Sequence, residues 1–454
     1  MIPGVALKAL AQTTGGHLIG QSVLVQGLAI DSRQVRKGDL FAAIRGARVD
    51  GHEFAANAMR AGAAALLTER RLEVLAPQLV VADVQRASGA LALLKRKLFQ
   101  GPVVAITGSA GKTTTKNMVS ATLSVAGSVH ATRGNQNNEL GVPLTLAGLD
   151  SQHQFAVIEM GAGQPGDIAY LCNLAEPDVS VCLNASAAHL AHFDSVDDIA
   201  STKGEIFQGL RGEGLAVINA DQPWLGQWIE QAGDARYVSF GLSAQADYRA
   251  VDLRHRGLAG AEFQLEARGF RLPVRLALPG KQQVMNALAA LAVAIELGVS
   301  PELAIEALGT VQAGAGRGAV LSGRWGGRII DDTYNANPAA VKAAIDVLAE
   351  ESGHRVLILG AMLELGIASE TLHEEVGAYA RSAGIEQLIA VGHEAKGAAV
   401  GFGEAALFFA DQASLRSGLL SLPADHVIWV KASRGAALEK TVGWLTSTEE
   451  SESC

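Results

Sequence analysis

The segment VVAITGSAGKTT, residues 103–114, decides how this chain folds. Its first five residues are apolar and mostly β-branched, which predicts a short buried strand. The glycines that follow predict a tight loop, and a helix is predicted over 112–126. A glycine-containing loop between a strand and a helix lets backbone N–H groups hold phosphate. Lys112 would reach the β- and γ-phosphates of a nucleotide, and the Thr113 hydroxyl would bind Mg²⁺.

The strict phosphate-loop pattern GxxxxGK[ST] is not met, because Ile106 stands where the first glycine belongs. An ordinary glycine-rich turn between a strand and a helix is therefore the alternative.

Short apolar runs on either side of this segment extend the pattern. Residues 155–159, 179–183 and 215–219 each read as a buried strand, with helical stretches between them. Strands that alternate with helices predict an α/β fold with a doubly wound, mostly parallel sheet. Between 247 and 278, alternating segments with glycine-rich turns predict an antiparallel insertion. Residues 284–297 predict a strong helix.

We predict three domains. Residues 1–82 form a small α/β unit, with strands at 23–25, 28–30 and 64–68 and an alanine-rich helix over 54–65. A helix over 87–99 leads into the central domain, 83–315, which carries the phosphate loop. Residues 316–454 follow the glycine-rich stretch 314–318 and repeat the strand–helix pattern, as in a smaller Rossmann-like domain.

Composition and charge narrow the class of protein. The 454 residues carry 37 basic and 46 acidic side chains, a formal charge of -9, which argues against general nucleic-acid binding. The three cysteines, Cys172, Cys182 and Cys454, are too few for a disulfide framework, so we expect a reducing compartment. The N-terminus lacks a basic stretch followed by an apolar run, and no apolar run approaches the ~18–20 residues of a membrane span. We therefore expect a cytoplasmic protein.

Two polar residues follow predicted strands of the central sheet. Glu159 ends one strand and His189 comes after another. Ligands of open α/β sheets bind beyond the carboxyl ends of the strands, so both side chains could hold a metal beside the phosphate loop. The alternative for each is an ordinary structural role.

Three further segments are candidates for a site. The two acids and the Asn- and Pro-rich loop of DDTYNANP, residues 331–338, indicate a site or an elaborate helix cap. The cluster NQNN, residues 135–138, indicates a polar substrate clamp or a turn, since asparagine tolerates left-handed backbone. Lys203 has no signature in its spacing, which fits a solvated lysine at a helix start.

Together these segments resemble the Mur ligase family, the ATP-dependent amide-forming enzymes of peptidoglycan precursor synthesis. The resemblance covers all of the chain except its acidic tail. The motifs that carry it are DSR at 31–33, TGSAGKTT at 107–114, NQNNELGVP at 135–143, IEMGA at 158–162, AAHL at 187–190, KGEIF at 203–207, DDTYNANP at 331–338, LELG at 363–366 and KASR at 431–434. At Ala361 the sequence departs from the aspartate that many members carry.

The resemblance implies a role for each matching residue. Lys112, Lys203, His189 and Glu159 would be catalytic. Thr113, Glu159, His189 and a Lys203 carbamylated by CO₂ would hold Mg²⁺, with two ions expected. The nucleotide side would comprise Thr107, Gly108, Ser109, Ala110, Gly111, Lys112, Thr113, Thr114, Asn286, Arg317, Asp332, Tyr334 and Asn337. The substrate side would comprise Asp31, Ser32, Arg33, Asn135, Asn137, Asn138, Lys431 and Arg434.

The most specific segments, at 135–143 and 331–338, resemble the members that join D-alanyl-D-alanine to UDP-N-acetylmuramoyl-tripeptide. This implies ATP and Mg²⁺ as cofactors, an acyl-phosphate intermediate and a UDP-substrate domain at the N-terminus. We expect a monomer. The alternatives are another amide ligase of the superfamily, which adds the third amino acid or extends folate with glutamate, and a nucleotide-binding switch without enzymatic activity. The DNPR motif typical of the third-residue-adding members is absent from the sequence.

Overall fold

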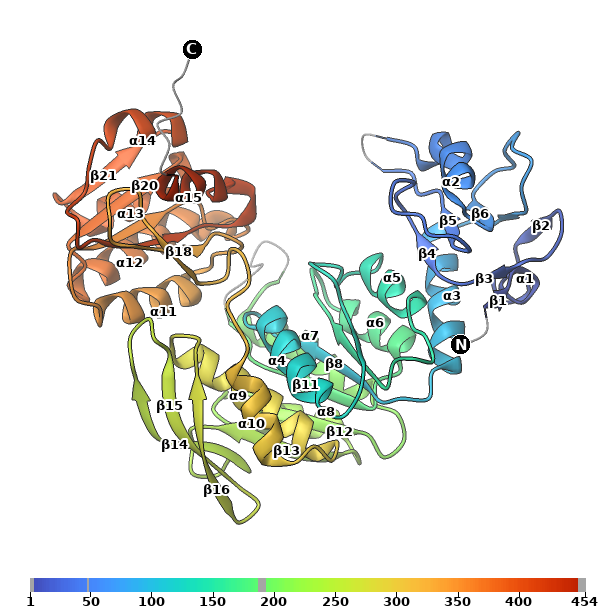
Figure 1. The fold of residues 1–454 in the computed structure, drawn as a ribbon, viewed down its shortest axis with the longest axis horizontal. Helices are drawn as coiled ribbons and strands as arrows, with labels where there is room; N and C mark the ends of the chain where they lie inside the picture. The colour runs from blue at the N-terminus through green and yellow to red at the C-terminus, as the bar shows by residue number, and fades with distance from the viewer. Residues whose placement is uncertain (1–3, 47–48, 187–192, 448–454) are drawn as a thin grey trace.

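The computed structural model describes residues 4–46, 49–186 and 193–447 (Figure 1). The N-terminal part of the chain, in blue, and the C-terminal part, in orange and red, stand on opposite sides of a central part in green and yellow (Figure 1). Each part has its own sheet, so the predicted α/β architecture of three units is confirmed.

The N-terminal unit is built on a five-stranded sheet. In spatial order its strands are β2 (His17–Ile19), β7 (Gln78–Val80), β6 (Ala65–Thr68), β5 (Leu40–Ala42) and β4 (Leu28–Ala29). A two-stranded sheet of β1 (Val5–Ala6) and β3 (Leu24–Val25) lies beside α1 (Leu7–Thr14). The helix predicted over 54–65 is shorter than expected: α2 spans Ala55–Ala61. Gly62 ends it at a φ of 108°, a left-handed conformation that stops a helix.

Helix α3 (Val84–Leu98) links the N-terminal and central units. It begins at Asp83, whose carboxylate accepts the Arg86 N–H at 2.9 Å. The residues of its first turns are buried in the core of the N-terminal unit, namely Val84, Ala87 and Leu91. Ala92 of α3 and Phe99 just after the helix are buried in the core of the central unit. One helix therefore completes two cores, and the predicted boundary between residues 82 and 83 falls just before it.

The central unit has a nine-stranded sheet. In spatial order its strands are β16 (Phe270–Leu276), β15 (Ala261–Ala267), β14 (Tyr248–His255), β13 (Arg236–Gly241), β12 (Leu215–Asn219), β11 (Val179–Cys182), β8 (Val103–Thr107), β10 (Phe155–Glu159) and β9 (Val129–Ala131). The pairs from β9 to β14 are parallel, whereas β14, β15 and β16 pair antiparallel. The predicted parallel sheet with an antiparallel insertion is confirmed.

Helices cover both faces of this sheet, as expected for a doubly wound fold. One apolar core lies under α4 (Lys112–Ser124), α9 (Lys281–Glu296) and α10 (Pro301–Gly309). The core on the other face lies under α5 (Gly141–Ala147), α6 (Asp167–Ala175), α7 (Val196–Gln208) and α8 (Leu225–Ala232). All parallel strands therefore present their carboxyl ends at one edge of the sheet.

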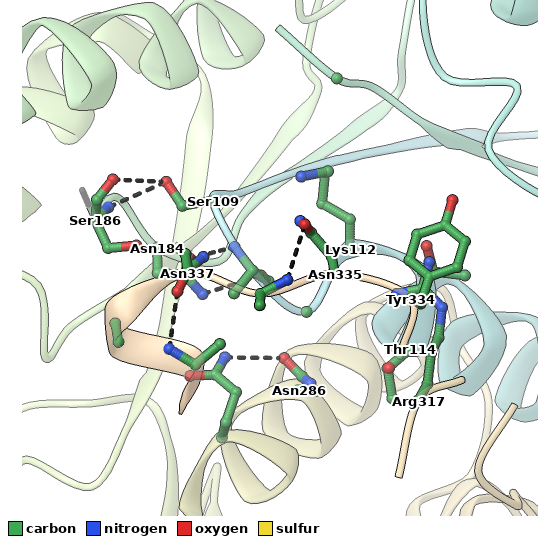
Figure 2. Close-up of a pocket in the computed structure, with 18 of the residues that line it drawn as sticks. Ser109, Lys112, Thr114, Asn184, Ser186, Asn286, Arg317, Tyr334, Asn335 and Asn337 are labelled. Carbon is green, nitrogen blue, oxygen red and sulfur yellow. Dashed lines mark hydrogen bonds between the residues drawn. The ribbon is translucent and has the colours of Figure 1, made fainter. Parts of the chain in front are cut away.

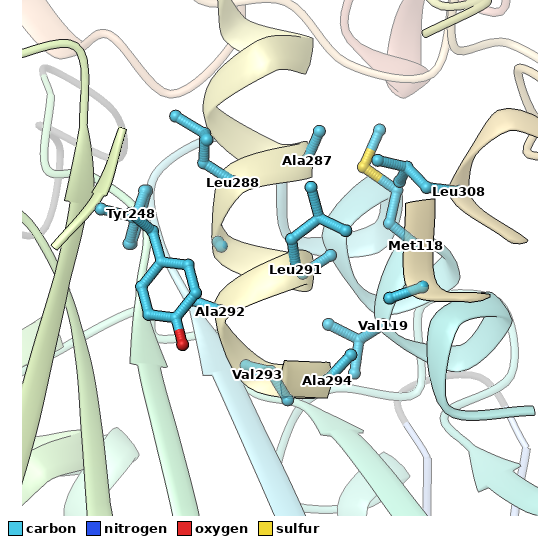
Figure 3. Close-up of a cluster of buried hydrophobic side chains, with 14 of the residues drawn as sticks. Met118, Val119, Tyr248, Ala287, Leu288, Leu291, Ala292, Val293, Ala294 and Leu308 are labelled. Atoms are coloured by element: carbon cyan, nitrogen blue, oxygen red, sulfur yellow. The ribbon is translucent and has the colours of Figure 1, made fainter. Parts of the chain in front are cut away.

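Helix α9 is the centre of the first core. Every residue from Val284 to Ala294 is buried, so the helix is enclosed on all sides. Figure 3 shows Leu291 directed at Met118 and Val119 of α4, while Tyr248 of β14 lies on the opposite side of α9. The many alanines of α9 let it approach both neighbours closely.

Leu291→Ala should lower the free energy of unfolding by about 2–5 kcal/mol, because it leaves a cavity between α9 and α4. The matched control is Leu303→Ala in the neighbouring α10, where the leucine is 49% exposed. The control should change stability by less than about 0.5 kcal/mol. Urea unfolding followed by circular dichroism measures both. Equal effects would show that the α9 core contributes no more than the surface.

The C-terminal unit has a six-stranded sheet. In spatial order its strands are β17 (Ala319–Ser322), β18 (Arg328–Asp332), β22 (Val427–Lys431), β19 (Arg355–Leu359), β20 (Gln387–Val391) and β21 (Ala406–Phe409). Only β17 pairs antiparallel. Helices α11 (Pro338–Ala349), α12 (Ser369–Ser382) and α13 (Lys396–Phe402) pack on one face, and α14 (Gln412–Gly418) and α15 (Glu439–Thr446) on the other. The predicted smaller Rossmann-like unit is confirmed.

Among all described helices, none has the length and hydropathy of a membrane span.

Candidate functional site

A cavity of about 790 Å³ lies where the carboxyl edge of the central sheet faces the C-terminal unit. Residues from both units line it, and Figure 2 shows those around the phosphate loop. The predicted site residues in the lining are Ser109, Ala110, Gly111, Lys112, Thr113, Thr114, Asn135, Asn137, Asn138, Glu159, Lys203, Asn286, Arg317, Asp332, Tyr334, Asn337 and Lys431. Segments that are far apart in the sequence thus form one site.

The phosphate loop connects β8 to α4, as predicted. Gly111 has a φ of 85°, and a Cβ there would lie 2.4 Å from Oδ1 of the buried Asn286, so no side chain fits. Asn184, which follows β11, holds the loop through two hydrogen bonds to Ala110. Its Oδ1 accepts the Ala110 N–H at 2.9 Å, and its Nδ2 donates to the Ala110 carbonyl at 3.1 Å. Ser186 and Ser109 are hydrogen bonded beside it (Figure 2).

The start of α4 fits an anion. Gly111 offers no side chain to cap the helix, and the first turn contains no acidic residue. The N–H groups of a helix's first turn lack intrahelical partners, and the helix dipole adds positive potential there. Lys112 adds a half-buried amine whose Nζ donates to the Gly108 carbonyl at 2.5 Å. Burial lowers the pKa of Lys112, and the charge of Glu159 opposes that shift. This is the setting that a phosphate group requires.

Glu159 lies at the end of β10 and is 2% exposed. Its carboxylate accepts a hydrogen bond from the Thr113 hydroxyl and one from the Asn137 Nδ2, both at 2.8 Å. Both donors are neutral, so its negative charge is not neutralised by them. A carboxylate beside a threonine hydroxyl and a phosphate site fits Mg²⁺, which prefers one or two carboxylates together with substrate phosphates. His189 falls outside the described residues.

The protein atoms alone do not build a metal cage. Within residues 4–46, 49–186 and 193–447, no group of three or more His, Cys, Asp or Glu side chains could hold a metal ion. A cation at Glu159 therefore needs ligands from phosphate and water as well, which is usual for Mg²⁺.

Lys203 lies inside α7 and is 4% exposed. The expectation of a solvated lysine at a helix start is wrong, because α7 begins at Val196 and turns this side chain into the cavity. Burial, and next the charge of Lys112, lower the pKa of Lys203 to about 7. Much of this amine is therefore neutral at neutral pH.

The predicted C-terminal residues form two groups. In the first, Lys431 donates from Nζ to the Asp332 carboxylate at 2.6 Å, and Trp429 donates from Nε1 to the same oxygen at 3.2 Å. In the second, the Arg317 guanidinium lies 3.8 Å above the Tyr334 ring and that of Arg434 lies 5.4 Å from it. Arg434 thus reaches the site through Tyr334, although it does not line the cavity.

The asparagines serve local structure as well as the cavity. Asn337 caps α11, because its Oδ1 accepts the Ala340 N–H at 2.8 Å, so the cap considered for residues 331–338 exists. Asn138 accepts the Gly141 N–H at 3.0 Å just before α5. We call residues 133–139 the asparagine loop. Its Asn137 contacts Glu159 rather than pointing freely into the cavity.

Besides Arg434, five described residues of the predicted site lie outside the lining. Thr107 is buried and donates to the Met160 carbonyl at 2.9 Å, and Gly108 contributes only the carbonyl that Lys112 contacts. Asp31, Ser32 and Arg33 belong to the N-terminal unit. There the Arg33 guanidinium, with a side chain 87% exposed, pairs with the Asp31 carboxylate at 2.7 Å.

The sequence prediction missed several residues of the site. They are Asn184, Ser186, Gln222, Gln283, Asn335 and Trp429. Asn184 could have been found, because it directly follows the predicted strand 179–183, and ligands bind beyond the carboxyl ends of such strands. Asn335 belongs to the segment 331–338, which was already a candidate for a site. The others carry no sequence signal, since only the tertiary fold brings them to the cavity.

Comparison with known proteins identifies the family. Residues 24–97, 106–294 and 316–443 match the family models described as Mur ligase family, catalytic domain; Mur ligase middle domain; and Mur ligase, glutamate ligase domain. The UDP-N-acetylmuramoyl-tripeptide--D-alanyl-D-alanine ligase of Escherichia coli (strain K12) is 39% identical over 445 residues, which are 96% of this chain and 97% of that protein.

Solved structures agree with the sequence comparison. A crystal structure of MurF from Acinetobacter baumannii superposes with a TM-score of 0.90 at 34% identity, over 98% of this chain and 99% of that one. MurF ligase from Thermotoga maritima in complex with ADP superposes with a TM-score of 0.83 at 32% identity, over 93% of this chain and 98% of that one. The matches cover all three units, so the chain belongs to the Mur ligase family.

Proposed function

We propose that this chain is an ATP-dependent, ADP-forming ligase that joins D-alanyl-D-alanine to UDP-N-acetylmuramoyl-tripeptide. The observation that carries the proposal is the cavity in which Lys112, Lys203 and Glu159 meet the uncapped start of α4. The Escherichia coli relative, named for this reaction, supports the choice of substrates. The product would be the UDP-N-acetylmuramoyl-pentapeptide used in peptidoglycan synthesis.

The nucleotide is expected to lie across the central and C-terminal units. Its phosphates would meet the backbone of residues 107–114 and the Lys112 amine. Asn286, Arg317, Asp332, Tyr334 and Asn337 would surround the ribose and the base. The aromatic ring of Tyr334 and the carboxylate of Asp332 line the cavity, which supports this assignment.

Mg²⁺ would be held by Thr113, Glu159, His189 and a carbamylated Lys203, and two ions are part of the proposal. When bound, Mg²⁺ offsets the negative charge of phosphates and carboxylates that must approach each other. In carbamylation the nitrogen of a neutral amine forms a bond to the carbon of CO₂ and loses a proton, which leaves a carbamate anion. The lowered pKa of Lys203, about 7, supports this modification because it keeps much of the amine neutral.

The reaction must activate a carboxylate, because a carboxylate does not react with an amine at neutral pH. One oxygen of the tripeptide's terminal carboxylate attacks the γ-phosphorus of ATP, and ADP leaves. The D-alanyl-D-alanine amine then attacks the carbonyl carbon of the acyl phosphate and loses a proton. The tetrahedral intermediate collapses to the amide and releases phosphate. Lys112 would stabilise the charge on the transferred phosphoryl group.

The peptide substrates would bridge the remaining parts of the chain. Asp31, Ser32 and Arg33 would bind the UDP end, and the asparagine loop, through Asn135, Asn137 and Asn138, would contact the peptide. Lys431 and Arg434 would meet the nucleotide or the incoming dipeptide from the C-terminal unit. Closure of the units would bring the reactants together and exclude water that hydrolyses the acyl phosphate.

The proposal includes a monomeric chain that acts in the cytoplasm, where ATP is supplied. Sedimentation velocity and cell fractionation test these two points.

The decisive experiment measures ADP release with ATP, Mg²⁺, UDP-N-acetylmuramoyl-tripeptide and D-alanyl-D-alanine, with each component omitted in turn. We expect release only when all are present, and a pentapeptide product by mass spectrometry. Glutamate with a folate acceptor, and an amino acid with the UDP-dipeptide, are the matched tests for the alternative ligases. Tight nucleotide binding without substrate-dependent ADP release would favour a switch and contradict the proposal.

A further inference from the structure

Lys116 is a buried lysine of the phosphate-loop helix that the proposed reaction does not use. It follows Lys112 by four residues and Thr113 by three, so the three side chains share one face of α4. The residue is 6% exposed. Its Nζ donates a 2.7 Å hydrogen bond to the backbone carbonyl of Thr132, which is a neutral group rather than a carboxylate.

Thr132 is a junction between three elements. It follows β9, and its N–H donates to the Val157 carbonyl of β10 at 3.0 Å. Its hydroxyl oxygen accepts the N–H of Glu159 at 2.9 Å. Through its carbonyl it is also held by Lys116 of α4. A shift of Thr132 would therefore move the backbone of Glu159.

The asparagine loop starts directly after Thr132, and its Asn137 contacts the carboxylate of Glu159. Asn137 donates to Glu159 Oε1 at 2.8 Å, and its carbonyl accepts the Gly161 N–H at 2.7 Å. Thr113 of α4 donates to the other oxygen of Glu159. The loop, α4 and Glu159 thus form one closed network, in which Lys116 contacts the Thr132 carbonyl.

The buried amine of Lys116 costs free energy at this position. A buried polar group costs free energy that an apolar side chain of the same length would avoid. Packing alone would therefore favour methionine over lysine. Methionine cannot donate the hydrogen bond that Lys116 makes to the Thr132 carbonyl. Burial lowers the pKa of Lys116, and the negative charge of Glu159 opposes that shift.

We propose that Lys116 is a positioning residue for the metal-side carboxylate: it fixes Thr132, and through Thr132 the backbone of Glu159 and the start of the asparagine loop. This inference rests on the proposed role of Glu159 in binding Mg²⁺. Groups that orient a metal ligand without touching the metal typically change metal affinity or activity by 10–100-fold when they are replaced.

The test is the Mg²⁺ dependence of ADP binding, measured by titration calorimetry on the full chain. For Lys116→Met we expect the Mg²⁺ concentration that gives half-maximal enhancement of ADP binding to rise by about 10-fold or more. ADP binding without Mg²⁺ should stay close to that of the wild type, because the phosphate loop keeps its own contacts. The control Lys8→Met replaces an exposed lysine of α1 and should leave both values unchanged.

A second variant keeps the test decisive if Lys116→Met does not fold. Thr132→Val removes the hydroxyl that accepts the Glu159 N–H but keeps the carbonyl that Lys116 contacts. It should shift the Mg²⁺ dependence in the same direction, and the double variant should shift it by less than the product of the two single effects, because both act through one junction.

Wild-type Mg²⁺ dependence in both single variants would overturn the inference, even if both variants were less stable to heat. ADP binding that ignores Mg²⁺ in the wild type would remove the metal role of Glu159 and overturn it as well. The titration needs neither peptide substrate. Failure of amide-bond formation would therefore leave this test intact and would count only against the proposed reaction.

Discussion

Lys112→Ala should lower kcat/KM for ADP formation by at least about 100-fold, the loss typical when one preorganised donor to a developing charge is removed. The γ-phosphoryl group and the peptide carboxylate are both anions, so their approach needs a fixed positive charge. Lys112 is half-buried at the start of α4, and its Nζ is held 2.5 Å from the Gly108 carbonyl. A partly buried charge acts more strongly than a fully solvated one, because less water screens it.

Steady-state ADP release, with ATP and tripeptide varied separately, measures this loss. Lys8→Ala, which changes an exposed lysine of α1, is the control and should match the wild type. Circular dichroism should give the same fold for both variants. ADP release unaffected by Lys112→Ala would rule out the assignment of residues 107–114 as a phosphate loop.

Lys203→Ala should abolish turnover, and formate or acetate should partly restore it. The alanine variant removes the group that would carry the carbamate and leaves a space inside the cavity. A small carboxylate can occupy that space and supply the lost oxygen ligands to Mg²⁺. Because the wild-type amine has a pKa of about 7, its carbamate should form at neutral pH.

The matched control is Lys203→Arg, which fills the space with a permanent cation that does not form a carbamate. It should be inactive and should not respond to formate. Activity as a function of formate concentration, together with ¹³C NMR of the wild type under ¹³CO₂, measures the effect. Full activity of Lys203→Ala at ambient CO₂ would contradict the carbamate role.

Much of the fold could be read from the sequence because local signals agreed with it. The β-branched runs at 103–107 and 155–159 became β8 and β10 with the bounds expected. Helix ends were less predictable, since the helix expected over 54–65 is stopped by a left-handed Gly62 that composition alone does not reveal. The order of strands in the nine-stranded sheet depends on contacts between distant segments, which no local pattern encodes.

Some residues of the site could likewise be predicted from the sequence, and others could not. Lys112 and Thr113 follow from a loop pattern with a physical mechanism, and strand ends indicated Glu159. Lys203 was found through family resemblance alone, because its burial arises from the packing of α7 against the central sheet. The contact of Asn137 with Glu159 and that of Lys116 with Thr132 depend on how the asparagine loop folds back, so no local pattern predicts either contact.

Helix α3 contributes residues to two cores, and this affects how the chain folds during its synthesis. Domains tend to fold from the N-terminus as the ribosome releases them. A nascent chain that ends at residue 82 holds all strands of the five-stranded sheet but lacks Val84, Ala87 and Leu91, which complete its core. Release of α3 supplies them, and Ala92 of the helix and Phe99 just after it then face segments that are still to be synthesised. The N-terminal unit should therefore mature in step with the central one rather than ahead of it.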